Sequence, residues 1–84
     1  MKVLDRHNIN KLSKILYNSN IMLSGDSQSF IKISEKLILN LQNEYDKDKL
    51  RRVIESDLTS TYGLEIEEDK IREITKKVYS WYHN

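Results

Sequence analysis

Apolar residues recur every three and four positions along four consecutive stretches of this chain. The spacing matches the 3.6-residue turn of an α-helix, so each stretch predicts an amphipathic helix with one apolar stripe. The sequence therefore predicts an all-α fold. The expected helices cover residues 8–20, 28–45, 47–62 and 67–82.

Short polar residues and one glycine mark the ends of these helices. Asp5 or Asn8 would accept the first backbone N–H groups of the first helix, and Asp26 or Ser27 those of the second. Gly63 directly follows the third stripe, where the left-handed conformation that ends many helices favours glycine. These signals leave only short polar segments between the helices.

The fourth helix has a start signal of its own. With Glu67 as the N-cap, Ile66 and Ile71 occupy the two positions of a hydrophobic staple. Connections of a few residues make consecutive helices antiparallel neighbours. The sequence therefore predicts a compact antiparallel four-helix bundle, formed as a single domain by residues 1–84.

Composition restricts what can stabilise such a bundle. The chain has 84 residues and no cysteine, so neither disulfides nor thiolate-bound metal supplement a small core. A homodimer that completes the core is an alternative to a self-sufficient monomer. The longest apolar runs are far shorter than the roughly 20 residues of a membrane span. Without a membrane segment or a secretory signal at the N-terminus, we expect a cytoplasmic protein.

The residue types that carry chemistry are sparse. His7 and His83 lie at opposite ends of the chain, without a carboxylate and a nucleophile at the spacing of a catalytic triad or a metal site. The acidic residues from Glu65 to Asp69 stand where a helix start favours negative charge. We therefore expect no catalytic residue, metal or cofactor, and a protein that acts by binding rather than as an enzyme.

Aromatic residues crowd the last turn and a half of the fourth helix. Tyr79, Trp81 and Tyr82 cannot all share the direction of the core stripe, and Trp81 continues that stripe most directly. Side chains with an apolar body and a polar tip are favoured anchors of protein interfaces. The three residues are candidates for a partner-binding surface. The alternative is an aromatic cap over the open end of the bundle.

Basic residues give a second candidate surface on the third and fourth helices. The pair resembles a helix-turn-helix loosely, and its basic side chains would meet nucleic-acid phosphates. The alternative is that neighbours such as Asp48 and Glu55 neutralise these side chains on a solvated face, because the formal net charge of the chain is only +1. The candidate nucleic-acid contacts are Arg51, Arg52, Lys76 and Lys77.

Three segments carry a resemblance to a known family: residues 12–18, the long apolar-striped stretch from Phe30 to Tyr45, and the stretch from Leu50 to Tyr62. Together they resemble the small immunity proteins that protect bacteria from class IIa bacteriocins. The resemblance covers most of the chain but includes no invariant motif, so it transfers no individual site residue. It implies an antiparallel four-helix bundle that recognises a toxin-bound membrane permease.

The sequence thus favours a helical protein that binds a protein partner, with bacteriocin immunity as its most concrete form. A phage- or plasmid-encoded regulator that binds nucleic acid through the third and fourth helices is one alternative. An antitoxin-like inhibitor of a host protein is another. Nucleic-acid binding should weaken steeply as the salt concentration rises, which separates the first alternative from a protein interface.

Overall fold

The computed structural model describes residues 3–19, 30–60 and 63–84, and within these ranges the chain folds into four α-helices. This confirms the prediction of an all-α four-helix bundle. The predicted caps Asp26 and Ser27 lie outside the described residues. The helices are α1 (Arg6–Tyr17), α2 (Ile31–Gln42), α3 (Lys47–Ser60) and α4 (Glu68–His83).

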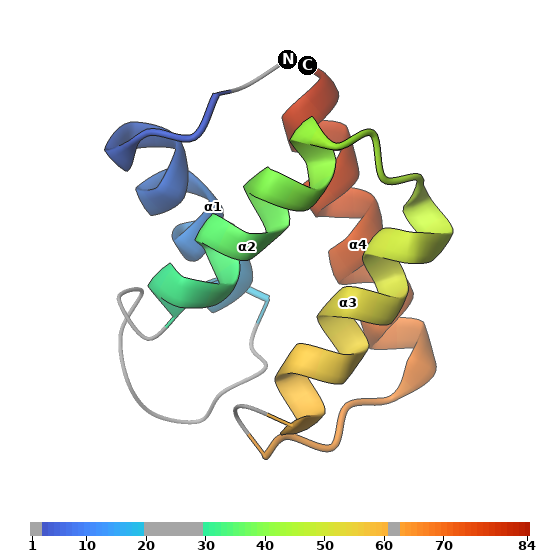
Figure 1. Cartoon of the computed structure of the whole chain (residues 1–84). Coiled ribbons are helices and arrows are strands. Elements are labelled where there is room, and N and C mark those ends of the chain that lie inside the picture. The colour runs from blue at the N-terminus through green and yellow to red at the C-terminus, as the bar shows by residue number, and fades with distance from the viewer. Residues whose placement is uncertain (1–2, 20–29, 61–62) are drawn as a thin grey trace.

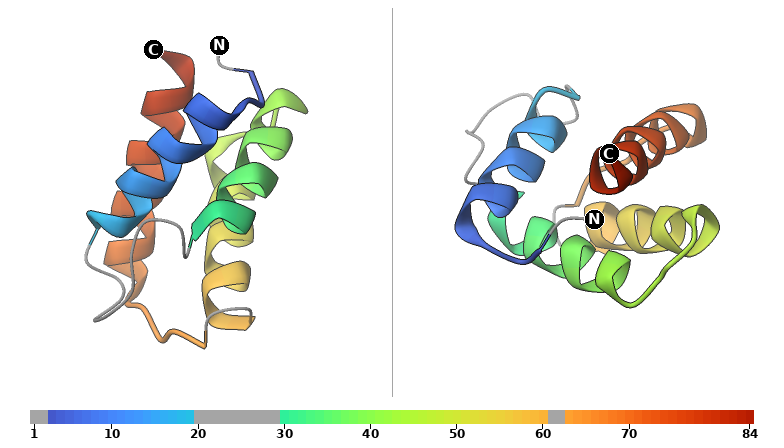
Figure 2. Two further views of the ribbon diagram at one scale, coloured as in Figure 1. Left: turned by 90° about the vertical axis from the view of Figure 1, so that its left-hand side faces the viewer. Right: turned by 90° about the horizontal axis from the view of Figure 1, so that it is seen from above.

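Consecutive helices run antiparallel and pack side by side (Figure 1). α1 also packs against α4, so the four helices close around one interior, as the end-on view in Figure 2 shows. α2 reaches across that interior to α4. Within the described ranges, no helix combines the length and the apolar character that a bilayer crossing requires.

The core consists mainly of residues from the predicted apolar stripes. Leu39 of α2 is an apolar residue outside this core, and 45% of it is exposed. At about 100° per residue, Leu39 points away from the direction shared by Ile33 and Leu37. The buried apolar residues are Leu12, Leu16, Phe30, Ile33, Leu37, Ile38, Leu41, Leu50, Ile54, Leu58, Ile71, Ile74, Val78 and Tyr82.

A side-chain cap sets the start of α1. The Asp5 carboxylate accepts a hydrogen bond from the backbone N–H of Asn8 at 2.8 Å, which satisfies one of the unpaired donors of the first turn. α1 therefore begins at Arg6, two residues before the predicted start. It ends at Tyr17 rather than at residue 20.

The starts of α3 and α4 differ in how they are capped. The Asp46 carboxylate accepts the backbone N–H of Lys49 at 2.9 Å. Glu67 is the N-cap residue of α4, as predicted, but its side chain accepts no capping hydrogen bond. Ile71 is buried and Ile66 packs against the core, as the two positions of a hydrophobic staple require.

α2 ends three residues before the predicted position. The backbone N–H of Glu44 donates to the carbonyl of Leu41 at 3.0 Å, and that of Tyr45 donates to Asn40 at 3.2 Å. These two bonds form a Schellman motif, and they place Glu44 in the left-handed region with φ of 62°. The periodic spacing of Tyr45 extends the apolar pattern past Gln42, but the backbone has already turned.

Gly63 adopts the backbone conformation that its position predicted. Its φ is 64°, and no atom lies within 4 Å of where a Cβ would stand. The next residue, Leu64, donates its backbone N–H to the carbonyl of Leu58 at 3.0 Å and packs against the core. α3 is described as far as Ser60, and residues 61 and 62 lie outside the described ranges.

A hydrogen bond and an ion pair each join two consecutive helices through residues 21 positions apart in the sequence. The hydroxyls of Ser13 on α1 and Ser34 on α2 lie 3.0 Å apart in the core, where the residues are 1% and 0% exposed. Lys36 on α2 pairs with Asp57 on α3 at 3.0 Å. Asp57 interrupts the apolar stripe of α3, and this ion pair explains how the interruption is accommodated.

Candidate functional site

The aromatic residues of α4 point in three directions. At about 100° per residue, Tyr82 lies within about 20° of the Ile71 direction, whereas Trp81 and Tyr79 lie about 80° to either side of it. Tyr82 is accordingly only 1% exposed, and Trp81 and Tyr79 are partly exposed. The core place predicted for Trp81 thus belongs to Tyr82. Tyr82 is therefore not available on the surface to a partner.

Trp81 borders a groove between α1 and α4, of about 640 Å³. Ile15 on α1 forms part of its apolar lining, and both Ile15 and Trp81 pack against the core while leaving part of their surface exposed. Exposed Ser80 lies beside Trp81. We call this the α1–α4 groove, lined by Ile15, Glu73, Lys76, Lys77, Ser80, Trp81 and Asn84.

Tyr79 faces the opposite side of α4, toward α3. The Lys47 ammonium lies 5.3 Å from the centroid of its ring, within the range of a cation–π contact. The His83 ring lies 4.4 Å from the Tyr79 ring and 5.1 Å from the Tyr82 ring, measured between centroids. The three aromatic candidates therefore form no single surface: one is buried, and the other two border opposite sides of α4.

A second groove runs between α3 and α4 and has a volume of about 350 Å³. Two cationic side chains from α3 and two from α4 line it, with a single carboxylate, that of Asp48. The buried Thr75 hydroxyl donates to the backbone carbonyl of Ile71 at 2.8 Å. We call this the α3–α4 groove, lined by Lys47, Asp48, Arg51, Arg72, Thr75 and Lys76.

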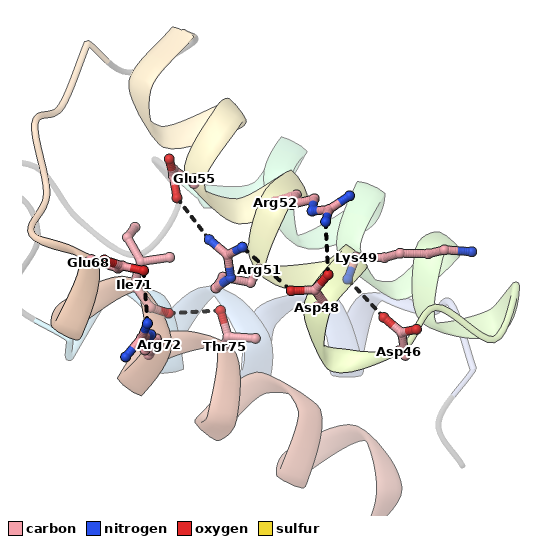
Figure 3. Close-up of polar contacts among 10 residues, drawn as sticks. All are labelled: Asp46, Asp48, Lys49, Arg51, Arg52, Glu55, Glu68, Ile71, Arg72 and Thr75. Carbon is pink, nitrogen blue, oxygen red and sulfur yellow. Dashed lines mark hydrogen bonds and ion pairs between the residues drawn. The ribbon is translucent and has the colours of Figure 1, made fainter.

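Intrahelical ion pairs hold the two arginines of this groove, as Figure 3 shows. Arg51 lies 3.2 Å from Glu55 and 3.5 Å from Asp48. Arg72 lies 2.9 Å from Glu68. Such pairs on a helix surface contribute only a few tenths of a kcal/mol each, so their main effect here is to orient the guanidinium groups.

The two lysines of the groove are held differently. In the described part of the chain, neither Lys47 nor Lys76 has a carboxylate within ion-pair distance. Lys47 lies over the Tyr79 ring, and Lys76 lines both grooves. Lys76 thus stands on the ridge that separates the two grooves.

The structure divides the four residues predicted to contact nucleic acid. Arg51 and Lys76 share the α3–α4 groove, whereas Arg52 lies outside it and pairs with Asp48 at 3.1 Å. Lys77 lines the α1–α4 groove and pairs with Glu73 at 3.2 Å. Neither groove contains all four. Lys47 and Arg72 complete the basic groove instead. Lys47 is spaced four residues from Arg51, and Arg72 four residues from Lys76, and this spacing was the sequence signal for the basic groove.

Glu73 contributes a carboxylate to the α1–α4 groove, and two lysines stabilise its charge. A hydrogen bond from Lys77, together with the nearby charges of Lys70 and Lys77, holds the pKa of Glu73 below its ordinary value. The Lys70 ammonium lies 4.0 Å from it. Glu73 therefore stays ionised at neutral pH and keeps the rim of this groove mixed in charge.

The two histidines lie on different helices, His7 on α1 and His83 on α4. Both His7 and His83 are exposed. Among the described residues, no three histidine or carboxylate side chains stand close enough together to hold a metal ion. The mainly apolar α1–α4 groove and the basic α3–α4 groove lie on the two sides of α4.

A comparison of the chain with protein-family models found no match, and searches of the curated proteins and of the solved structures found none either.

Proposed function

We propose that this protein acts by binding a protein partner through the α1–α4 groove, with Trp81 as the principal anchor. The observation that carries the proposal is the position of Trp81. Because Tyr82 fills the core, the indole remains partly exposed beside Ile15 in an apolar recess. Tryptophan is among the residue types that contribute most to protein interfaces, especially when the partner seals the pocket around it.

The occupant that fits this groove is a segment of a partner protein with an apolar side chain and at least one carboxylate. The apolar side chain would pack between Ile15 and Trp81. The carboxylate would meet Lys76, which has no carboxylate partner in the described ranges, at the rim. An apolar centre with a charged rim is the usual anatomy of a protein interface.

The most concrete form of this proposal is a cytoplasmic immunity protein against a class IIa bacteriocin. Its support is the resemblance carried by residues 12–18, 30–45 and 50–62, together with the four-helix architecture. In this form the partner is a membrane permease to which the toxin is bound. Expression of the chain in a sensitive strain should raise survival in the presence of the toxin, and a groove-blocking variant should not.

A groove-blocking substitution tests the site itself. Ser80→Arg adds a long side chain to the α1–α4 groove at an exposed helical position and removes no core contact. Ser56→Arg makes the same change at an exposed position of α3, away from this groove, and is the matched control. Circular dichroism should show both variants folded. Only the Ser80 variant should lose the partner.

The assay is affinity capture from source cells with the wild type and the two variants, followed by direct titration of the purified partner. A protein that the wild type and Ser56→Arg bind in moderate salt, and Ser80→Arg does not, supports the proposal. If both variants retain the partner, the α1–α4 groove is not the site. Recovery of nuclease-sensitive material that is lost as salt rises would favour the nucleic-acid alternative.

A further inference from the structure

The α3–α4 groove concentrates positive charge in a chain that is nearly neutral. Lys47 and Arg51 are spaced four residues apart on α3, and Arg72 and Lys76 are spaced four apart on α4. Residues four apart lie on the same face of a helix. Because α3 and α4 are antiparallel neighbours, the two basic rows line one groove between them. Figure 3 shows one member of each row, Arg51 on α3 and Arg72 on α4.

The carboxylates around this groove do not use all of that charge. Arg51 and Arg72 are oriented by pairs within their own helices, while Lys47 and Lys76 have no carboxylate partner among the described residues. In Figure 3 the guanidinium of Arg51 lies between Asp48 and Glu55 of α3, and Thr75 of α4 lines the same groove. The groove therefore presents two guanidinium groups, which ion pairs orient. It also presents the ammonium groups of Lys47 and Lys76, which have no carboxylate partner among the described residues.

Lys76 connects this groove to the proposed partner site, because it lines both grooves. A segment anchored at Trp81 that continues across α4 passes Lys76 and then meets Arg51 and Arg72. We infer that the α3–α4 groove binds an acidic stretch of the same partner, with two or more Asp or Glu carboxylates next to its apolar anchor. This inference rests on the proposed function and specifies the chemistry of the partner.

The surroundings of the groove favour a short acidic peptide over a nucleic acid. Glu55 and Glu68 lie beside the arginines, and Asp48 lies in the groove itself. A continuous phosphate backbone that leaves the groove would run past these carboxylates and be repelled. A peptide places its carboxylates only where the four cations are, so its charge complements the groove without extending to the acidic rim.

The test is an NMR titration of the ¹⁵N-labelled full chain with a synthetic peptide of about six glutamates. Four exposed ion pairs predict a Kd on the order of 1 mM at low salt, weakening as salt rises to about 250 mM. The largest shifts should fall on α3 and α4 around the groove. A lysine peptide and an oligothymidylate of matched charge are titrated in parallel.

A pair of double variants with equal changes in net charge decides whether the groove is the binding site. Lys47→Gln with Lys76→Gln removes the two cations that lack a carboxylate partner and should weaken the glutamate peptide about tenfold, a few-fold for each cation. Lys11→Gln with Lys14→Gln removes two exposed lysines from α1 and should weaken binding less than twofold.

Three results would overturn the inference: no saturable shifts, equal weakening by both double variants, or tighter binding of the oligothymidylate than of the peptide. The Ser80→Arg variant separates this inference from the proposed function. If it retains the protein partner while the glutamate peptide still binds at the α3–α4 groove, the α1–α4 site fails and the acidic-peptide site stands. If the peptide does not bind but Ser80→Arg loses the partner, the reverse holds.

Discussion

The buried hydroxyl pair between α1 and α2 gives a prediction with an internal check. Ser13 and Ser34 are almost fully buried, and their Oγ atoms lie 3.0 Å apart. Replacing either residue by alanine leaves the other hydroxyl without its partner in the core. Replacing both removes the donor and the acceptor together, so no unsatisfied group remains.

The expected energies follow from that difference. An unsatisfied buried hydroxyl costs about 1–3 kcal/mol, and alanine returns roughly 0.5 kcal/mol through its higher helix propensity. Each single variant should therefore lower the free energy of unfolding by about 1–2 kcal/mol. The double variant should lie within about 0.5 kcal/mol of the wild type, which implies a coupling energy on the order of 2–4 kcal/mol.

Urea denaturation followed by far-UV circular dichroism measures these differences, provided that the m-value stays constant across the set. For a domain of this size, 1 kcal/mol corresponds to a shift in Tm of about 4–8 °C. Ser56→Ala, at an exposed helical position, is the control and should change stability by less than about 0.5 kcal/mol. A double variant whose loss equals the sum of the two single losses would refute the reasoning.

Three further predictions concern the backbone, an interhelical ion pair and pH. Gly63 and Glu44 both have φ near +60°, which only glycine adopts without cost. Gly63→Ala should therefore lower the free energy of unfolding by about 1 kcal/mol, whereas Glu44→Gly should raise it or leave it unchanged. Chemical denaturation measures both changes, and a change of the same sign in the two variants would contradict the argument. Lys36→Met should lower the free energy of unfolding by about 1 kcal/mol or less, since most of the lysine side chain is exposed although Asp57 is mostly buried. In a double-mutant cycle, Lys36→Met should have no such effect when Asp57→Asn is already present. The pKa of Glu73 is lowered in the folded state, so its ionised form contributes stability above its ordinary pKa of 4.5. That contribution is lost as pH falls through the pKa of the folded protein. Glu73→Gln should remove the contribution of Glu73 to the acid dependence of Tm, measured in thermal melts between about pH 2 and 6.

Local patterns predicted the four helices and most of the core. The stripes of Ile33 and Leu37 or of Ile71 and Ile74 follow from helical spacing alone. Gly63 indicated the end of α3 because the left-handed backbone conformation at that position favours glycine. The end of α2 escaped prediction because Glu44 takes the same left-handed conformation without being glycine, and Tyr45 continues the apolar period past it.

The candidate site depended on distances that no local pattern contains. Arg51 and Lys76 share a groove only because α3 and α4 pack together. The roles of Trp81 and Tyr82 were accessible in principle, since the angular position of each residue on α4 separates them. The spacing of three or four residues from Val78 fits both positions, and only the direction of the whole stripe decides between them.

The single tryptophan of the chain lies where α1 meets α4, so its fluorescence reports on one corner of the bundle. Backbone ellipticity, in contrast, averages over all four helices. Coincident unfolding curves from the two signals would show that α1 stays docked until the whole bundle melts. An emission change that precedes the loss of ellipticity would identify the detachment of α1 as the first step of unfolding, with the other three helices still folded.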